Sequence, residues 1–216
     1  MRWLVFLVVC LAFSAPAQPG TDAALIEAAA RADVGEVRRL LGQGASVRAR
    51  DAQSRTPLLA ATQSNCVECA RLLIGAGADV NAKDAISDSP YLLAGARGRL
   101  DILRLTLAAG ADLKSTNRFG GTALIPACHY GHVDTVRELL KTRVAIDHVN
   151  NLGWTCLLEA VILGDGGPAY VEIVRMVLAA GANPNLADRQ GLTALGHARS
   201  RGQAAVIPLL VEAGAK

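Results

Sequence analysis

Residues 56–84 read TPLLAATQSNCVECARLLIGAGADVNAKD, and the rest of the chain is phased against this stretch. An apolar residue follows the Thr-Pro pair, and apolar residues recur in register with it, first at steps of 33 residues and then at a final step of 38. These anchors are Leu25, Leu58, Tyr91, Leu124, Leu157 and Leu195. A period of this length predicts supersecondary units that bury their apolar faces only by stacking on their neighbours.

A closing Gly-Ala step repeats in the same phase. It occurs at residues 44–45, 77–78, 110–111, 181–182 and 214–215, whereas Arg143-Val144 occupies the slot between the third and fourth of these. Glycine adopts positive φ without steric cost, and arginine does not. We therefore expect a local irregularity at Arg143.

Period and residues together resemble the ankyrin repeat. The family pattern opens one helix with Thr-Pro-Leu, places Gly-His before a second helix, and continues with paired leucines and a Gly-Ala-Asp turn. It is visible here as Thr56-Pro57-Leu58, Gly131-His132, Leu139-Leu140 and Gly77-Ala78-Asp79. The resemblance implies an all-α ankyrin-repeat solenoid of about six helix-turn-helix repeats with short β-hairpin fingers. Approximate repeat bounds are 22–50, 51–83, 84–116, 117–149, 150–187 and 188–216.

Local signals refine these units. Asp22 is expected to cap the first helix, and Pro126 is expected at the fourth position of its helix, where one backbone hydrogen bond would be lost. Residues 165–169 (DGGPA) account for the longer step and predict a loop between the two helices of the fifth repeat. Pro208 is expected inside the last helix, where a terminal element with one free face tolerates it.

The amino terminus has a different character from the repeats. Arg2 supplies a positive charge, residues 4–13 are apolar, and Ala15-Pro16-Ala17 provides small residues for cleavage. This pattern predicts a signal peptide over residues 1–17, cleaved after Ala17, followed by a short linker over 18–21. The apolar run is too short to span a bilayer, so we expect a periplasmic or secreted protein with no membrane attachment after cleavage.

Composition limits the classes of partner. The chain has 216 residues, of which 51% are hydrophobic and 4% aromatic, and this suits one core of small and aliphatic side chains. Its 22 basic and 19 acidic residues give a net charge of +3, which provides no strong field for nucleic acid. We expect a protein partner, no nucleic acid, and a monomer.

Four cysteines follow the predicted leader. Cys66 and Cys69 have the Cys-x-x-Cys spacing, which allows a small disulfide and offers an alternative function in thiol-disulfide exchange. No thioredoxin-like βαβ pattern surrounds them, so a catalytic redox role is the lesser hypothesis. Cys128 and Cys156 fall in the first helices of neighbouring repeats, and for these we predict buried free thiols.

The sequence supplies no catalytic constellation. His129 and His132 lie three apart on one helical face, but the family uses the Gly-His ring to hold a turn, so His132 already has a structural cause. The glycines fall at repeat turns rather than in a phosphate loop, and neither a nucleophile elbow nor an HExxH motif occurs. We expect no catalytic residues, no metal and no cofactor.

The class of function that remains is recognition of a partner at the protein surface. In the family, partners lie against the fingers and the concave face of the first helices. Aligning the repeats places candidate contact residues there, and aromatic residues and arginine carry much of the binding energy at interfaces. The residues predicted to contact a partner are Arg97, Phe119, His129, Tyr130, Trp154 and Glu159.

The resulting hypothesis is an exported, non-enzymatic protein-binding module. The leader and compact size are similar to those of periplasmic bacterial ankyrin-repeat proteins, and that resemblance suggests support of oxidative-stress defence, for instance of a peroxide-destroying enzyme. A secreted effector that acts on a host protein is a further alternative.

Overall fold

The computed structural model describes residues 19–216. The predicted signal peptide and its cleavage site after Ala17 lie outside the described residues. Within residues 19–216 the chain forms twelve α-helices. They are α1 (Pro19–Ala30), α2 (Val34–Gly42), α3 (Pro57–Gln63), α4 (Val67–Gly75), α5 (Pro90–Ala96), α6 (Leu100–Ala108), α7 (Leu124–His129), α8 (Val133–Leu140), α9 (Cys156–Ile162), α10 (Pro168–Ala179), α11 (Ala194–Ser200) and α12 (Ile207–Glu212).

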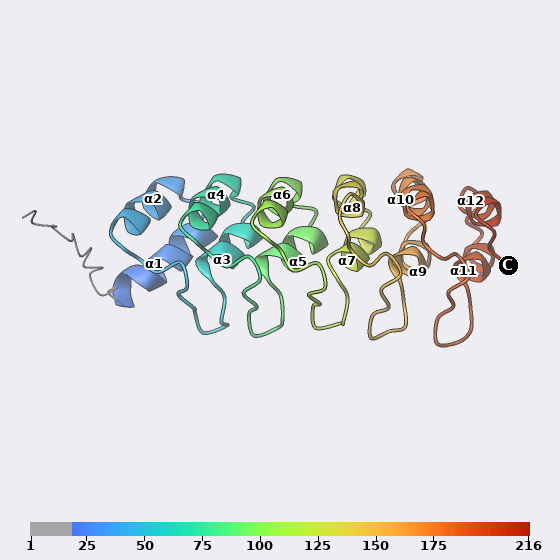
Figure 1. Cartoon of the computed structure of the whole chain (residues 1–216), viewed down its shortest axis with the longest axis horizontal. Helices are drawn as coiled ribbons and strands as arrows, with labels where there is room; N and C mark the ends of the chain where they lie inside the picture. The colour runs from blue at the N-terminus through green and yellow to red at the C-terminus, as the bar shows by residue number, and fades with distance from the viewer. Residues whose placement is uncertain (1–18) are drawn as a thin grey trace, which may run out of the picture.

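The helices stand as antiparallel pairs in a single row. Figure 1 shows the odd-numbered helices in one layer, the even-numbered helices in a second, and the loops after α2, α4, α6, α8 and α10 projecting together beyond the odd-numbered layer. Each odd-numbered helix packs on its partner and on the odd-numbered helices of adjacent repeats. The predicted all-α solenoid of six repeats is confirmed.

We call the odd-numbered helices the inner helices and the even-numbered ones the outer helices. Most inner helices begin at a side-chain cap. The Thr56 hydroxyl accepts from Leu59 N at 3.2 Å, and Pro57 occupies the first helical position, where an N–H would have no intrahelical partner. Ser89, Thr155 and Thr193 cap α5, α9 and α11 in the same way. The repeated hydroxyl in the sequence therefore sets where each of these helices starts.

Two expectations at the start of the chain are wrong. Helix α1 begins at Pro19, so residues 19–21 belong to the helix rather than to a linker. Asp22 lies inside the first turn, and its carboxylate accepts from Ser46 N at 2.7 Å instead of capping α1. This contact ties the first helix to the turn after α2.

Both prolines predicted in helix interiors lie in first turns. Helix α7 begins at Leu124, so Pro126 is its third residue, and α12 begins at Ile207, so Pro208 is its second. An N–H at these positions would lack an intrahelical acceptor anyway, so neither proline removes a helical hydrogen bond. The insertion does fall between α9 and α10, but its last two residues, Pro168 and Ala169, already belong to α10.

The core runs continuously along the row. Leu58, Leu124 and Leu157 belong to one cluster of buried side chains that reaches from α1 to α12, and each is at most 2% exposed. Apart from Tyr91, small and aliphatic side chains and the cysteines fill it, because adjacent helices must approach closely for the repeats to stack. Among residues 19–216, no helix is both long enough and apolar enough to cross a membrane.

The irregularity expected at Arg143 is present. After α6, Gly110 takes φ +85° and Ala111 N donates to Thr106 O at 3.1 Å. Arg143 does not adopt positive φ, and Val144 N donates instead to the Thr142 hydroxyl at 3.2 Å. That hydroxyl in turn donates to Leu139 O at 2.6 Å. One side chain thus replaces a backbone hydrogen bond of the usual turn.

Thr142→Ala is expected to lower the free energy of unfolding by about 1 kcal/mol, because it leaves the Val144 amide and the Leu139 carbonyl without this bridge. Thr142→Ser keeps the hydroxyl and is expected to retain most of the stability. Urea unfolding followed by circular dichroism measures both. Equal losses in the two variants would show that the hydroxyl does not support the turn.

Candidate functional site: the inner groove

Each finger, the five-residue tip of a loop between repeats, is held by the Asp or Asn side chain at its first position. Asn117 Oδ1 accepts from Phe119 N at 2.9 Å and from Gly121 N at 3.1 Å, while Asn117 N donates to Gly121 O at 2.9 Å. The same pattern begins at Asp51, Asp84, Asn150 and Asp188. Within residues 19–216 the only isolated β bridge pairs Ala187 with Thr193 and no strand is assigned, so side-chain oxygens and short-range backbone hydrogen bonds together close the fingers.

The fingers and the inner helices enclose a groove, which we call the inner groove, of about 650 Å³. Its lining residues come mainly from α5, α7 and α9 and from the fingers that begin at Asn117 and Asn150. Five of the six residues predicted to contact a partner line it. They are Arg97, Phe119, His129, Tyr130 and Glu159.

Exposed apolar side chains form the walls of the inner groove. Phe119 is 52% exposed, Tyr130 58% and Leu152 50%. The Arg118 guanidinium lies 4.7 Å from the centre of the Phe119 ring, and Tyr130 stacks on His129 with ring centres 4.1 Å apart. These contacts hold two large rings in place while leaving much of their surface open.

Glu159 lines the inner groove, as its predicted position on an inner helix implies, but it is buried in the floor of the groove. Glu159 is only 5% exposed, and its Oε1 accepts a hydrogen bond from Asn150 Nδ2 at 2.7 Å. Oε2 lies 3.6 Å from His129 Nδ1. Burial raises the pKa of Glu159 to about 7, opposed by the Asn150 hydrogen bond, and burial lowers the pKa of His129.

Folding stability is expected to fall as the pH rises from 4.5 to above 7. The pKa of Glu159 is about 7 in the folded state but 4.5 in the unfolded chain, so the folded state binds the proton more tightly. The contribution is complete below pH 4.5 and is lost as the pH passes 7. Relative to Glu159→Gln, the wild type should lose about 3 kcal/mol across this range. Urea unfolding at several pH values measures the difference; parallel curves would contradict it.

Trp154 does not line the inner groove. It is half-buried and packs against the edge of the core, and its backbone N donates to Asn150 Oδ1 at 3.0 Å. The structure therefore separates this residue from the other five predicted contact residues.

The histidines are held by structural contacts. His132 packs beneath the Gly98 turn of the preceding repeat, where a β-carbon on residue 98 would lie 2.7 Å from the ring. His148 Nε2 lies 2.7 Å from Gly120 O, and His197 Nε2 lies 2.7 Å from Asp188 Oδ2. No three His, Cys, Asp or Glu side chains gather as metal ligands in the described part of the chain.

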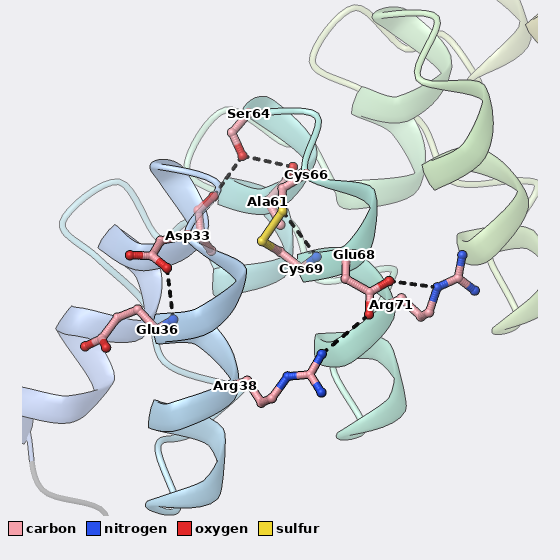
Figure 2. The surroundings of a disulfide bond; sticks show 10 residues. Asp33, Glu36, Arg38, Ala61, Ser64, Cys66, Glu68, Cys69 and Arg71 are labelled. Carbon is pink, nitrogen blue, oxygen red and sulfur yellow. Dashed lines mark hydrogen bonds and ion pairs between the residues drawn. A yellow bond between two sulfur atoms is a disulfide. The ribbon is translucent and has the colours of Figure 1, made fainter.

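Cys66 and Cys69 form a disulfide at the start of α4 (Figure 2). Cys66 is the N-cap, and its sulfur accepts from Cys69 N at 3.2 Å. Cys66 is 7% exposed and Cys69 is fully buried. An attacking thiolate must reach a disulfide sulfur for exchange to occur, so this burial disfavours the alternative function in thiol-disulfide exchange.

The prediction of free thiols at Cys128 and Cys156 is wrong. These two residues form a second disulfide, with Cα atoms 5.5 Å apart, between the inner helices α7 and α9. Both half-cystines are fully buried. The bond joins the fourth and fifth repeats directly beside the inner groove, since His129 follows Cys128 and Glu159 lies three residues after Cys156.

Sequence reasoning missed the residues that build the groove from beneath. Asn117 and Asn150 hold the two finger loops, and Leu93 and Pro126 line the inner groove. The signal for the asparagines was available, because every finger begins with Asp or Asn in the same register. Such residues bond their own backbone two residues on, which marks a turn.

Known proteins share both the sequence pattern and the fold. A family model described as ankyrin repeats in three copies matches residues 6–84 and 92–188. The crystal structure of an ankyrin repeat domain from Acinetobacter baumannii AYE is 58% identical, with a TM-score of 0.86 over 89% of this chain and 98% of that chain. The ankyrin repeat protein EF0377 is 41% identical, with a TM-score of 0.85 over 88% and 98%.

Two further similarities, one at lower identity and one over a shorter stretch, point to the same family. The ankyrin repeat domain of Bcl-3, described as a member of the IkappaB protein family, is 29% identical, with a TM-score of 0.79 over 89% of this chain and 86% of that chain. The ankyrin repeat protein YahD of Escherichia coli K12 is 46% identical over 57 residues, which span 26% of this chain and 28% of YahD. The chain belongs to the ankyrin repeat family.

Proposed function

We propose that this chain is an exported, non-enzymatic module that binds a segment of a partner protein in its inner groove. Proteins of its family typically bind other proteins. The observation that carries the proposal is the inner groove itself, which combines about 650 Å³ of open volume with exposed Phe119, Tyr130 and Leu152 side chains. Rigid, partly exposed rings lose little entropy on binding and suit a protein ligand.

Mutation of the groove tests this proposal. Phe119→Ala with Tyr130→Ala is expected to weaken partner binding by about 100-fold or more while leaving the unfolding transition nearly unchanged, because both rings are more than half exposed. The partner is captured from the exported fraction of the source cell with tagged wild-type protein, identified, purified, and its affinity measured by calorimetry.

Val211→Ala is a matched control, since Val211 is 49% exposed but lies on α12, away from the inner groove. It should retain wild-type affinity. A partner that binds the double Ala variant as tightly as the wild type would exclude the inner groove as its binding site.

Two features support export. Residues 1–17 have the pattern of a signal peptide, and the structure has two disulfides, which persist in oxidising compartments outside the cytosol. Intact mass and cell fractionation test this part of the proposal. We expect a mature chain that begins at Gln18 in the exported fraction; a full-length chain retained in the cytosol would exclude export.

The finer proposal is support of periplasmic defence against peroxide, which rests on resemblance to periplasmic ankyrin-repeat proteins. Deleting the gene should then raise sensitivity to hydrogen peroxide. Wild-type protein should restore tolerance, and the Phe119→Ala, Tyr130→Ala variant should not. Unchanged sensitivity in the deletion strain would exclude this role and leave protein binding as such untouched.

A further inference from the structure

The carboxylates of the inner groove are already occupied by the protein's own donors. Asp88 Oδ2 lies 3.4 Å from Arg118 Nη1, and Glu159 Oε1 accepts from Asn150. Burial raises the pKa of both carboxyl groups, most clearly that of Glu159. A cationic partner would therefore have to displace an existing contact or ionise a carboxyl group that burial keeps partly protonated.

The two arginines at the α5 end of the inner groove form no ion pair within residues 19–216. Arg97 is the C-cap of α5 and Arg99 is the N-cap of α6, so they flank the Gly98 turn. Arg97 is exposed and has no ion pair with any residue from 19 to 216, although its charge, like that of Arg118, acts to lower the pKa of Asp88. Arg99 Nε is buried without a hydrogen-bond partner.

Apolar side chains continue from this end of the groove. The Tyr130 ring occupies the C-cap slot of α7, one repeat after Arg97, and Leu163 occupies the C-cap slot of α9. Tyr130 and Leu163 are exposed and, with Arg97 and Arg99, line the same groove. A ligand that enters here therefore meets guanidinium groups first and then a ring and a leucine.

We propose that the partner is a protein segment whose Asp or Glu carboxylate binds between Arg97 and Arg99, with apolar side chains following it over Tyr130 and Leu163. Guanidinium groups bind carboxylates through paired hydrogen bonds, so the Arg97 and Arg99 side chains that line this end of the groove match an acidic residue. The inference rests on the proposed function, because it specifies the partner of the same groove.

A peptide library tests the proposal without a known partner. Random twelve-residue peptides displayed on phage are selected on immobilised wild-type protein and depleted on the Phe119→Ala, Tyr130→Ala variant. Enriched sequences are synthesised with a fluorescent label, and their affinities are measured by anisotropy. We expect an Asp or Glu followed by apolar residues in the enriched peptides, and affinities that weaken as salt rises.

The pairing is then tested by a double-mutant cycle. Arg97→Gln should weaken binding of an acidic peptide about 10-fold, and it should have little effect on the same peptide with Glu replaced by Gln. Arg201→Gln is the matched control, because Arg201 is exposed in the C-cap slot of α11 but does not line the inner groove. It should leave the affinity unchanged.

The outcomes separate the two proposals. Peptides that require Phe119 and Tyr130 but carry Lys or Arg, or that bind equally well to Arg97→Gln, would overturn the acidic partner and leave protein binding in the groove intact. Failure to select any peptide that depends on Phe119 and Tyr130 would count against both. Enrichment of acidic peptides whose affinity depends on Arg97 supports both.

Discussion

Removal of the Cys128–Cys156 disulfide is expected to lower the free energy of unfolding by about 3–4 kcal/mol. The bond closes a segment with a sequence separation of 28, and closure of a loop of this length restricts the unfolded chain by that amount. The double variant Cys128→Ala, Cys156→Ala provides the test, because alanine adds no unsatisfied polar group to this buried site. Urea unfolding without reductant measures the loss.

The other disulfide supplies the comparison. Cys66 and Cys69 are separated by only three positions, so the same reasoning predicts a smaller loss of about 2 kcal/mol for Cys66→Ala, Cys69→Ala. If both double variants lost equal stability, loop closure would not be the main contribution of the longer link. Wild-type protein unfolded with and without a reductant should reproduce the sum of the two losses.

Leu139→Ala is expected to lower the free energy of unfolding by about 2–5 kcal/mol. Leu139 lies on α8, is fully buried, and belongs to the continuous core. The substitution removes apolar contacts and leaves a cavity that the close-packed neighbours fill only in part. Because repeats are stabilised by their neighbours, the loss should extend to hydrogen exchange in the third and fifth repeats.

Leu140→Ala is the control for this substitution. Leu140 is the other member of the leucine pair and is only partly buried at the edge of the core. Its truncation should cost clearly less than that of Leu139. Equal losses at the two positions would show that the register assigned to α8 is wrong.

The fold could be predicted from the sequence because it depends on local patterns that repeat. The 33-residue period, the hydroxyl before most inner helices and the glycine after all outer helices but α8 specify the same unit several times. The same comparison identified the exception at Arg143. Agreement among several repeats compensates for the weakness of any one signal.

The second disulfide and the burial of Glu159 depend on distances between repeats, which the repeat pattern of the sequence does not specify. Cys128 and Cys156 are separated by 28 positions, and they meet only because α7 and α9 pack at a spacing that brings their Cα atoms within 5.5 Å. Glu159 is buried because the finger that begins at Asn150 closes over it. Alignment of repeats places this residue on the inner face but does not show that depth.

Helix starts were misjudged at Pro126 and Pro208 for a more local reason. Pro126 is expected at the fourth helical position if its helix starts directly after Thr122, whereas α7 begins two residues after Thr122; Pro208 is expected inside its helix, whereas α12 begins one residue before it. Proline favours the first turn, so the positions of these two prolines predict the helix starts more directly.

The link between α7 and α9 also sets how far the molecule can extend under force. A chain held by its two ends and stretched until every helix has unfolded would still keep the segment between Cys128 and Cys156 outside the path of tension. At about 3.3–3.6 Å for each extended residue, that segment would withhold about 90–100 Å of contour length until the sulfur–sulfur bond is reduced.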